Sequence, residues 1–246
     1  MIKTGSLVEE QRVEVTRTSY KNYNVGDSIK IHGKTKIGHV AGKVNDPKTG
    51  EQAYIVTPNN PKSKNFDPKK VKNVTVLYRG STGANKLLQK DQTGHDARRD
   101  WVQNDIPAAV GIFNNVSAAN LQKFSQTTSA GFPLSSYVIA LQTVDQGTPQ
   151  MHASAQTLHQ VLKHYPQAQV DVYGHSLGSM NGQYALAHTS QAEAKRIRVA
   201  YLYEGPNVYS LLNPKEKKRT EQLKSRIFNY VDPKDKIMIN EKMRLN

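Results

Sequence analysis

The sequence predicts an α/β protein with a mainly parallel central sheet, helices on both faces and an antiparallel hairpin at the N-terminal edge. Three observations lead to this fold class. Strand-like and helix-like segments alternate after residue 70, which is typical of parallel sheets. Before that point, strand-like runs follow one another with no helical segment between them. The length of 246 residues suits a single domain, 1–246, with one continuous core.

The N-terminal part is expected to begin with a helix and continue as strands. Residues 6–20 are weakly amphipathic and belong to a helical extension, residues 1–25. The stretch Asn-Asp-Pro-Lys-Thr-Gly at 45–50 carries Pro and Gly where a tight reversal needs them. Strands are expected on both sides of that turn and beyond it, at 28–32, 37–44, 52–57 and 74–78.

The remainder of the chain shows alternating patterns after a polar, glycine-containing stretch at 80–99. Apolar residues recur at helical spacing over 150–164, and short apolar runs bounded by turn residues indicate strands. Helices are expected at 100–124, 150–164, 178–188 and 214–225, and strands at 137–143, 170–173, 199–203 and 226–231.

Composition excludes several classes of protein. No stretch approaches the roughly 18 apolar residues that span a bilayer. The absence of cysteine excludes disulfides, thiolate metal sites and a cysteine nucleophile. No group of His, Asp and Glu has metal-ligand spacing, so neither a metal nor a cofactor is expected. The 34 Lys and Arg against 20 Asp and Glu give a net charge of +14, which favours anionic partners.

The most informative motif is Gly174-His175-Ser176-Leu177-Gly178, a G-x-S-x-G pattern between an apolar strand and a helix. This pattern places a serine on a sharp, strained strand-to-helix turn, and the glycines allow the close approach of the backbone. The turn sets Ser176 at the positive end of the following helix, where a developing oxyanion is stabilised. Ser176 is therefore the expected nucleophile.

Four ordered motifs give the sequence a family resemblance. Besides the elbow, these are Tyr78-Arg79-Gly80-Ser81, Asp100-Trp101 with Asp105, and Tyr203-Glu204-Gly205-Pro206. Together they resemble the α/β-hydrolases of the class 3 lipase type, over roughly residues 50–240. A narrower resemblance, carried by residues 174–185 and the Lys/Asn/Gln-rich composition, is to the lipase domains of type VII-secreted toxins of Gram-positive bacteria.

The resemblance implies roles for particular residues. Ser176 attacks an ester carbonyl, and the backbone N–H groups of Ser81 and Leu177 form the oxyanion hole. The implied substrates are glycerolipids or phospholipids, cleaved through an acyl-serine intermediate. Residues 84–99 are long enough for a lid, although an ordinary loop has the same pattern.

An acid is expected just beyond the last strand, in the order Ser, Asp, His that this fold uses. Asp235 is favoured, and Asp232, which precedes a proline, is the alternative. No histidine follows, because His188 is the last one in the chain. Three explanations stay open: a downstream segment or domain supplies the histidine, an upstream residue such as His95 serves, or the fold is catalytically silent. His175 is expected to be structural.

The basic surface suggests partners and a route. Lysines between 62 and 72, the cluster at 215–219, and Lys234 with Lys236 suit an anionic membrane. Nucleic acid is not expected, because no basic platform with interleaved aromatics is present. The N-terminus does not have the pattern of a secretory signal peptide. The narrower resemblance implies secretion without a cleaved signal, with the cytoplasm as the alternative. The narrower resemblance implies a secretion chaperone or an immunity protein. The rival function is a silent domain that binds anionic membrane or a protein partner.

Overall fold

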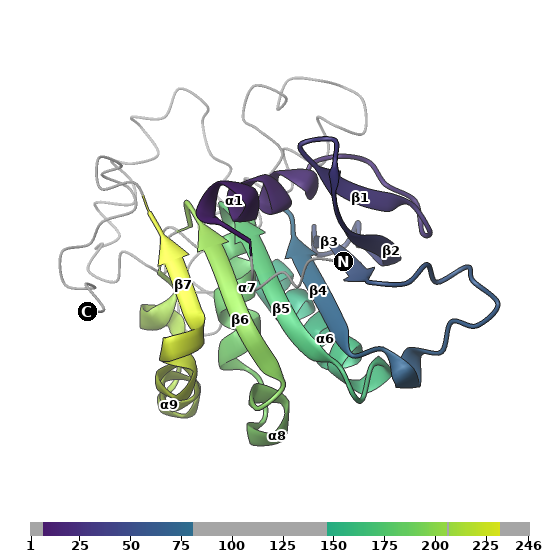
Figure 1. The fold of residues 1–246 in the computed structure, drawn as a ribbon. Helices are drawn as coiled ribbons and strands as arrows, with labels where there is room; N and C mark the ends of the chain where they lie inside the picture. The colour runs from purple at the N-terminus through teal and green to yellow at the C-terminus, as the bar shows by residue number, and fades with distance from the viewer. Residues whose placement is uncertain (1–6, 81–146, 206, 232–246) are drawn as a thin grey trace.

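The computed structural model describes residues 7–80, 147–205 and 207–231, and these form a mixed seven-stranded sheet with helices on both faces (Figure 1). The strands lie side by side in chain order, from β1 to β7. The strands are β1 (Ser28–Ile31), β2 (Thr35–Asn45), β3 (Gln52–Thr57), β4 (Asn73–Tyr78), β5 (Gln169–His175), β6 (Ile197–Tyr203) and β7 (Ile227–Tyr230). Every predicted element within the described ranges is found to within three residues at each end. The helix expected at 100–124 and the strand expected at 137–143 lie outside these ranges.

The sheet divides into an antiparallel half and a parallel half. Strands β1 to β4 pair antiparallel, whereas β4 to β7 pair parallel. The prediction of a mainly parallel sheet is therefore only partly correct for the described strands, because the antiparallel part extends beyond one hairpin. The connection from β3 to β4 contains only the short 3₁₀ helix η2 (Pro68–Lys70), which is too little for the crossover that parallel strands require.

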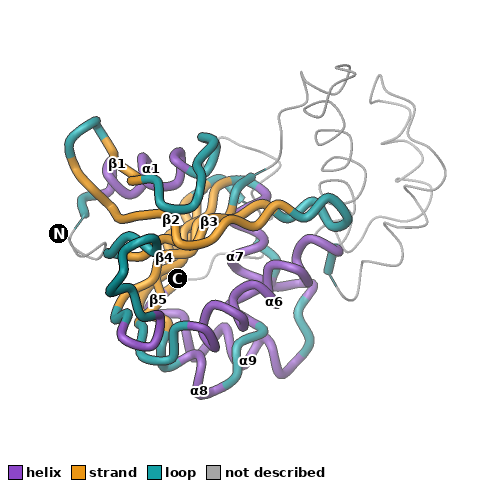
Figure 2. The backbone as a smooth tube through the Cα atoms, turned by 90° about the vertical axis from the view of Figure 1, so that its right-hand side faces the viewer, coloured by secondary structure: helices purple, strands orange, loops and turns teal. Residues whose placement is uncertain are grey.

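Helices cover the two faces unequally. The helix α1 (Glu9–Thr18) lies on one face, and α6 (Pro149–His164) and α7 (Leu177–Ala187) lie on the other, with the sheet between them in Figure 2. The helices α8 (Gln191–Ala194) and α9 (Pro214–Leu223) lie on the same side as α6. No helix in the described ranges is long and apolar enough to cross a membrane.

The side chains of the parallel strands alternate between two cores. Val74, Val76 and Tyr78 of β4 pack toward α6 and α7, and Leu77 packs toward α1. Strand β5 follows the same alternation, with Val172 on the α6 side. Because both faces are covered, these strands are buried along most of their length, and their C-terminal ends meet at one edge of the sheet. Strand β5 leads directly from that edge into α7.

Candidate active site

Ser176 lies on the sharp turn between β5 and α7. Its backbone has φ 55° and ψ −127°, a left-handed conformation that is rare for a residue with a side chain. Its N–H donates to the carbonyl of Tyr203 on β6 (2.8 Å), and its carbonyl accepts from Ser179 N–H (2.9 Å). The Ser176 side chain does not cap α7 by a hydrogen bond. The turn thus has the strained geometry that the sequence motif predicts, and the Ser176 hydroxyl is not used to cap the helix.

The glycines around Ser176 permit very close backbone contacts. A Cβ on Gly174 would lie 2.3 Å from the carbonyl oxygen of Gly178. A Cβ on Gly178 would lie 2.3 Å from the carbonyl oxygen of Tyr78, at the end of β4. A Cβ on Gly205, after β6, would lie 2.8 Å from the Ser176 carbonyl oxygen. Backbone atoms cannot move aside as a flexible side chain can, so all three positions require glycine.

The end of β4 also reaches the turn through Gly80. A Cβ on Gly80 would lie 3.1 Å from Ser176 Cβ and 2.6 Å from the His175 carbonyl oxygen. Ser81, the other expected oxyanion donor, follows Gly80 directly but lies outside the described residues. Leu177 is the first residue of α7, and the first N–H groups of an α-helix have no partner within the helix. The Leu177 N–H is one of these groups, and its role in an oxyanion hole stays a prediction.

A hydrogen-bonded network joins α7 to β7. Ser179 Oγ donates to Asn229 Oδ1 and accepts from Gln183 Nε2, both at 3.3 Å. The Asn229 amide nitrogen donates to the carbonyl of Gly205 at 3.5 Å. Strand β7 is thereby tied to the nucleophile helix just before the segment that carries Asp232 and Asp235. Those two residues, the expected acids, lie outside the described residues.

The side chain of His175, which precedes the expected nucleophile, contacts the N-terminal segment. Its Nδ1 is 2.8 Å from the hydroxyl of Tyr20, and the two rings meet edge to face. Burial lowers the pKa of His175; the charge of Glu204 opposes this shift and that of Arg17 adds to it. A neutral imidazole held by Tyr20 fits the predicted structural role.

Seven of the eight histidines lie in the described ranges, and the six besides His175 have contacts with other parts of the molecule or with solvent. His188 ends α7, about 16 Å along the helix from its start, and its Nε2 pairs with Glu216 at 3.2 Å. His152 stands edge to face with Tyr184, and His159 pairs with Glu193 at 2.7 Å. The other three partners are a backbone carbonyl for His39, Tyr165 for His164, and solvent for exposed His32. His95 lies outside the described residues.

The residues that sequence reasoning missed come from distant segments. Tyr20 reaches the turn from a position 155 residues earlier in the chain, and Asn229 reaches it from β7. No short motif encodes either contact. Within 7–80, 147–205 and 207–231, no group of three or more His, Asp or Glu residues could hold a metal ion. The expectation that the protein uses neither a metal nor a cofactor stays a prediction.

A family profile matches part of the chain. The profile of the family described as Mbeg1-like matches residues 140–239, which include β5, Ser176, α7, β6 and β7. The match covers 100 of the 246 residues. A search of curated proteins finds no match to the chain.

Proposed function

We propose that the protein is a serine ester hydrolase of α/β-hydrolase type that cleaves acyl esters of glycerolipids or phospholipids. The observation that carries this proposal is the backbone of Ser176, held at φ 55° on a strand-to-helix turn by close glycine contacts. Strain of this kind costs free energy and persists only where the surrounding structure enforces it. A serine that needed no exposed, fixed hydroxyl would not require such a turn.

The proposed reaction proceeds in two steps. Ser176 Oγ bonds to the ester carbonyl carbon, its proton passes to the catalytic base, and the carbonyl oxygen becomes an oxyanion. The N–H groups of Leu177 and Ser81 stabilise that oxyanion, and the alcohol leaves with the proton. Water then cleaves the acyl-serine ester and releases the fatty acid. Asp235, with Asp232 as the alternative, orients the base.

The base itself is a histidine that the described residues do not supply at the turn. His95 is the candidate within the chain, and a histidine from a downstream segment is the other. The described histidines do not decide between His95 and a downstream histidine, because their contacts concern only the seven histidines other than His95. The same observation supports the rival proposal, a silent hydrolase fold that binds anionic membrane or a protein partner.

The test is hydrolysis of p-nitrophenyl butyrate by the 246-residue chain and its Ser176→Ala variant. A short soluble ester tests the catalytic groups without a lipid interface. We expect turnover that Ser176→Ala lowers by on the order of a thousandfold or more. Ser225→Ala, at an exposed position beyond α9, is the matched control and should keep full activity. Activity that survives Ser176→Ala would refute the proposed nucleophile.

The base is tested in the same assay. If His95 serves, His95→Ala loses activity to the same degree, whereas His164→Ala, exposed at the end of α6, does not. A chain that neither hydrolyses the ester nor forms a covalent adduct with a fluorophosphonate supports either the silent fold or a histidine supplied by a downstream segment. Transfer of the acyl group to an added alcohol in place of water would identify an acyltransferase with the same nucleophile.

A further inference from the structure

The N-terminal segment reaches the nucleophile turn through one side chain, Tyr20. Its hydroxyl is 2.8 Å from His175 Nδ1, and the ring centroids are 5.6 Å apart in an edge-to-face arrangement. Tyr20 follows α1 by two residues, so its position depends on where that helix packs. The contact joins two residues that are 155 positions apart in the sequence.

The same hydroxyl lies against the end of β4. It stands 2.2 Å from where a Cβ on Gly80 would be, so Tyr20 occupies the space that any other residue at position 80 would need. The guanidinium carbon of Arg79 lies 5.7 Å from the centre of the Tyr20 ring, within range of a cation–π interaction. Tyr20 therefore lies against the ends of both β4 and β5, next to Ser176.

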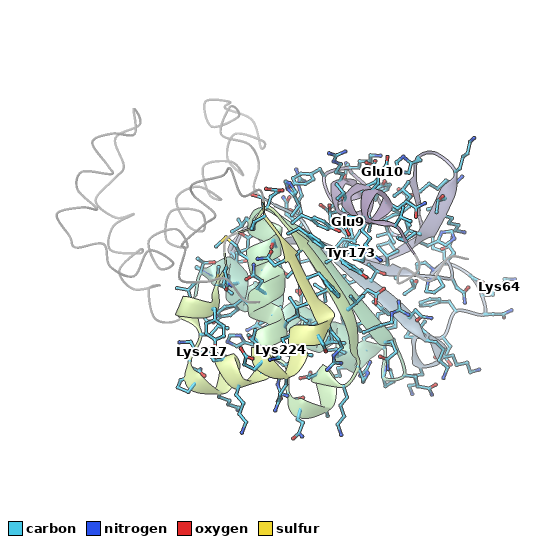
Figure 3. All side chains as sticks on the ribbon, turned by 60° about the vertical axis from the view of Figure 1, so that its left-hand side comes forward. Glu9, Glu10, Lys64, Tyr173, Lys217 and Lys224 are labelled. Carbon is cyan, nitrogen blue, oxygen red and sulfur yellow. The ribbon has the colours of Figure 1, made fainter. Side chains whose placement is uncertain are left out.

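The helix α1, which ends two residues before Tyr20, is held against the sheet by buried and hydrogen-bonded side chains. Val15 is fully buried in the core between α1 and the sheet. Glu9, at the start of α1, accepts a 2.6 Å hydrogen bond from the hydroxyl of Tyr203 on β6, and Figure 3 shows Glu9 on the part of α1 that overlies Tyr173. After the helix, Tyr20 N–H donates to the Arg17 carbonyl. These contacts hold the Tyr20 backbone in place over the edge of the sheet.

We propose that Tyr20 is a positioning residue for the nucleophile turn, which makes the N-terminal segment part of the active site. Its hydroxyl contacts His175, whose peptide bond leads into Ser176, and lies against Gly80, while its ring lies under the guanidinium of Arg79. The strained backbone of Ser176 needs contacts on all sides, and Tyr20 supplies those on the α1 face. This inference rests on the proposed hydrolase function.

Two charged groups and one hydroxyl group act on His175. Arg17 on α1 and Glu204 after β6 act on the imidazole in opposite directions, and Tyr20 contacts Nδ1 directly. A neutral imidazole can accept the Tyr20 hydrogen at Nδ1, whereas a protonated one cannot. Burial lowers the pKa of His175, which keeps this hydrogen bond available at neutral pH.

The test compares Tyr20→Phe with Tyr23→Phe. Tyr20→Phe keeps the ring and removes only the hydroxyl. Tyr23 is three residues further on, its ring packs edge to face on Tyr54, and its substitution is chemically identical. With p-nitrophenyl butyrate, we expect Tyr20→Phe to lower kcat by about 10- to 100-fold, because small displacements of a reacting group are costly, with KM within about twofold. Tyr23→Phe should leave kcat within about twofold.

A second readout does not depend on turnover. In ¹⁵N-labelled protein, Tyr20→Phe should shift the backbone amide signals of His175, Ser176 and Leu177, and Tyr23→Phe should not. The double variant Tyr20→Phe/His175→Gln should be no slower than His175→Gln alone, since both changes break one hydrogen bond. Equal behaviour of Tyr20→Phe and Tyr23→Phe in both kcat and amide shifts would overturn the proposal.

The two proposals fail in different ways. A wild-type chain without ester hydrolysis or fluorophosphonate adduct refutes a hydrolase whose catalytic groups all lie within these 246 residues, and with it a catalytic purpose for Tyr20 in this chain. The amide shifts then still decide whether Tyr20 holds the turn. An active wild type whose Tyr20→Phe variant keeps full kcat refutes only the role of Tyr20.

Discussion

Glu51 is a carboxylate buried beneath α6, only 2% exposed, at the turn that leads into β3. Thr157 Oγ1 on α6 donates to its Oε2 at 3.0 Å. Burial raises the pKa of Glu51 to about 7, against the hydrogen bond from Thr157. The proposed reaction does not use this group, so its effect falls on stability.

We expect stability to fall as pH rises from 4.5 to 7 because of Glu51. In this window the folded protein holds a proton that the unfolded chain has already released, so rising pH favours unfolding. The contribution is on the order of 3 kcal/mol. Glu51→Gln removes it, so the variant should lose less stability than wild type between pH 5 and pH 8 in urea unfolding.

Glu10→Gln is the control for this measurement. Glu10 is exposed on α1, and its substitution should leave the pH dependence as it is in wild type. If Glu51→Gln and wild type unfold with the same pH dependence, the carboxyl group of Glu51 titrates normally despite its burial.

The side chain of Arg198 on β6 links three neighbouring strands, through an ion pair with β5 and a hydrogen bond with β4. Arg198 on β6 forms two hydrogen bonds with the carboxylate of Asp171 on β5, at 2.7 and 2.6 Å, and a third with Asn73 on β4. Asp171 is fully buried. Burial raises the pKa of Asp171 and Arg198 opposes this, so the aspartate depends on its partner to stay charged.

Arg198→Leu is expected to destabilise the protein by about 3 to 5 kcal/mol, because it leaves Asp171 buried without its cation. Chemical denaturation measures the loss. Lys224→Leu, which breaks an exposed pair with Glu221, should change stability by less than about 1 kcal/mol. The double variant Asp171→Val/Arg198→Leu should be more stable than Arg198→Leu alone. A double variant that is less stable would mean that Arg198 contributes mainly through packing.

The elements themselves were largely predictable, whereas the direction of the strands was not. Apolar runs such as Val74–Leu77 and the hairpin turn at 45–50 have local signatures, so β2, β3 and β4 appear where the sequence predicts them. A run of apolar residues has the same pattern in a parallel and an antiparallel strand. Direction follows from the connections, and the β3–β4 connection holds too little helix for a crossover.

The candidate site shows the same division. The Ser176 turn is predictable because its conformation is enforced by residues next to it in sequence, Gly174 and Gly178. Tyr20 and Asn229 are not, because each reaches the turn through the packing of a whole element, α1 or β7. Sequence patterns of this kind report local geometry and leave long-range contacts undetermined.

The net charge of +14 is a property of the whole molecule, and its largest clusters lie far apart. The loop before β4 carries exposed lysines with one acidic neighbour, Asp67, whereas α9 mixes its basic residues with Glu216 and Glu221. Lys64 on the loop and Lys217 on α9 are on opposite sides of the molecule in Figure 3. The exposed lysines of the loop are Lys62, Lys64, Lys69, Lys70 and Lys72.

We expect the protein to bind vesicles of anionic phospholipid through this loop. Each lysine near an anionic surface contributes about 1 kcal/mol, and salt weakens the attraction. Binding in a sedimentation assay should be lost in about 0.5 M salt and be absent for zwitterionic vesicles. Reversal of Lys62, Lys64 and Lys69 to Glu should abolish it, whereas the same change in net charge at Lys215, Lys217 and Lys218 should not. Equal losses in the two triple variants would show that total charge, and no particular patch, drives the binding.

The central pairing of the sheet joins two strands that are distant along the chain. Strands β4 and β5 are neighbours over six residue pairs, yet 90 residues separate Tyr78 from Gln169. The entropy lost on closing such a connection grows only logarithmically, by about 0.6 kcal/mol for each doubling of its length. Related chains could therefore gain or lose dozens of residues here and keep the same sheet. The rate of folding would respond more than the stability, since β5 must find β4 across that distance.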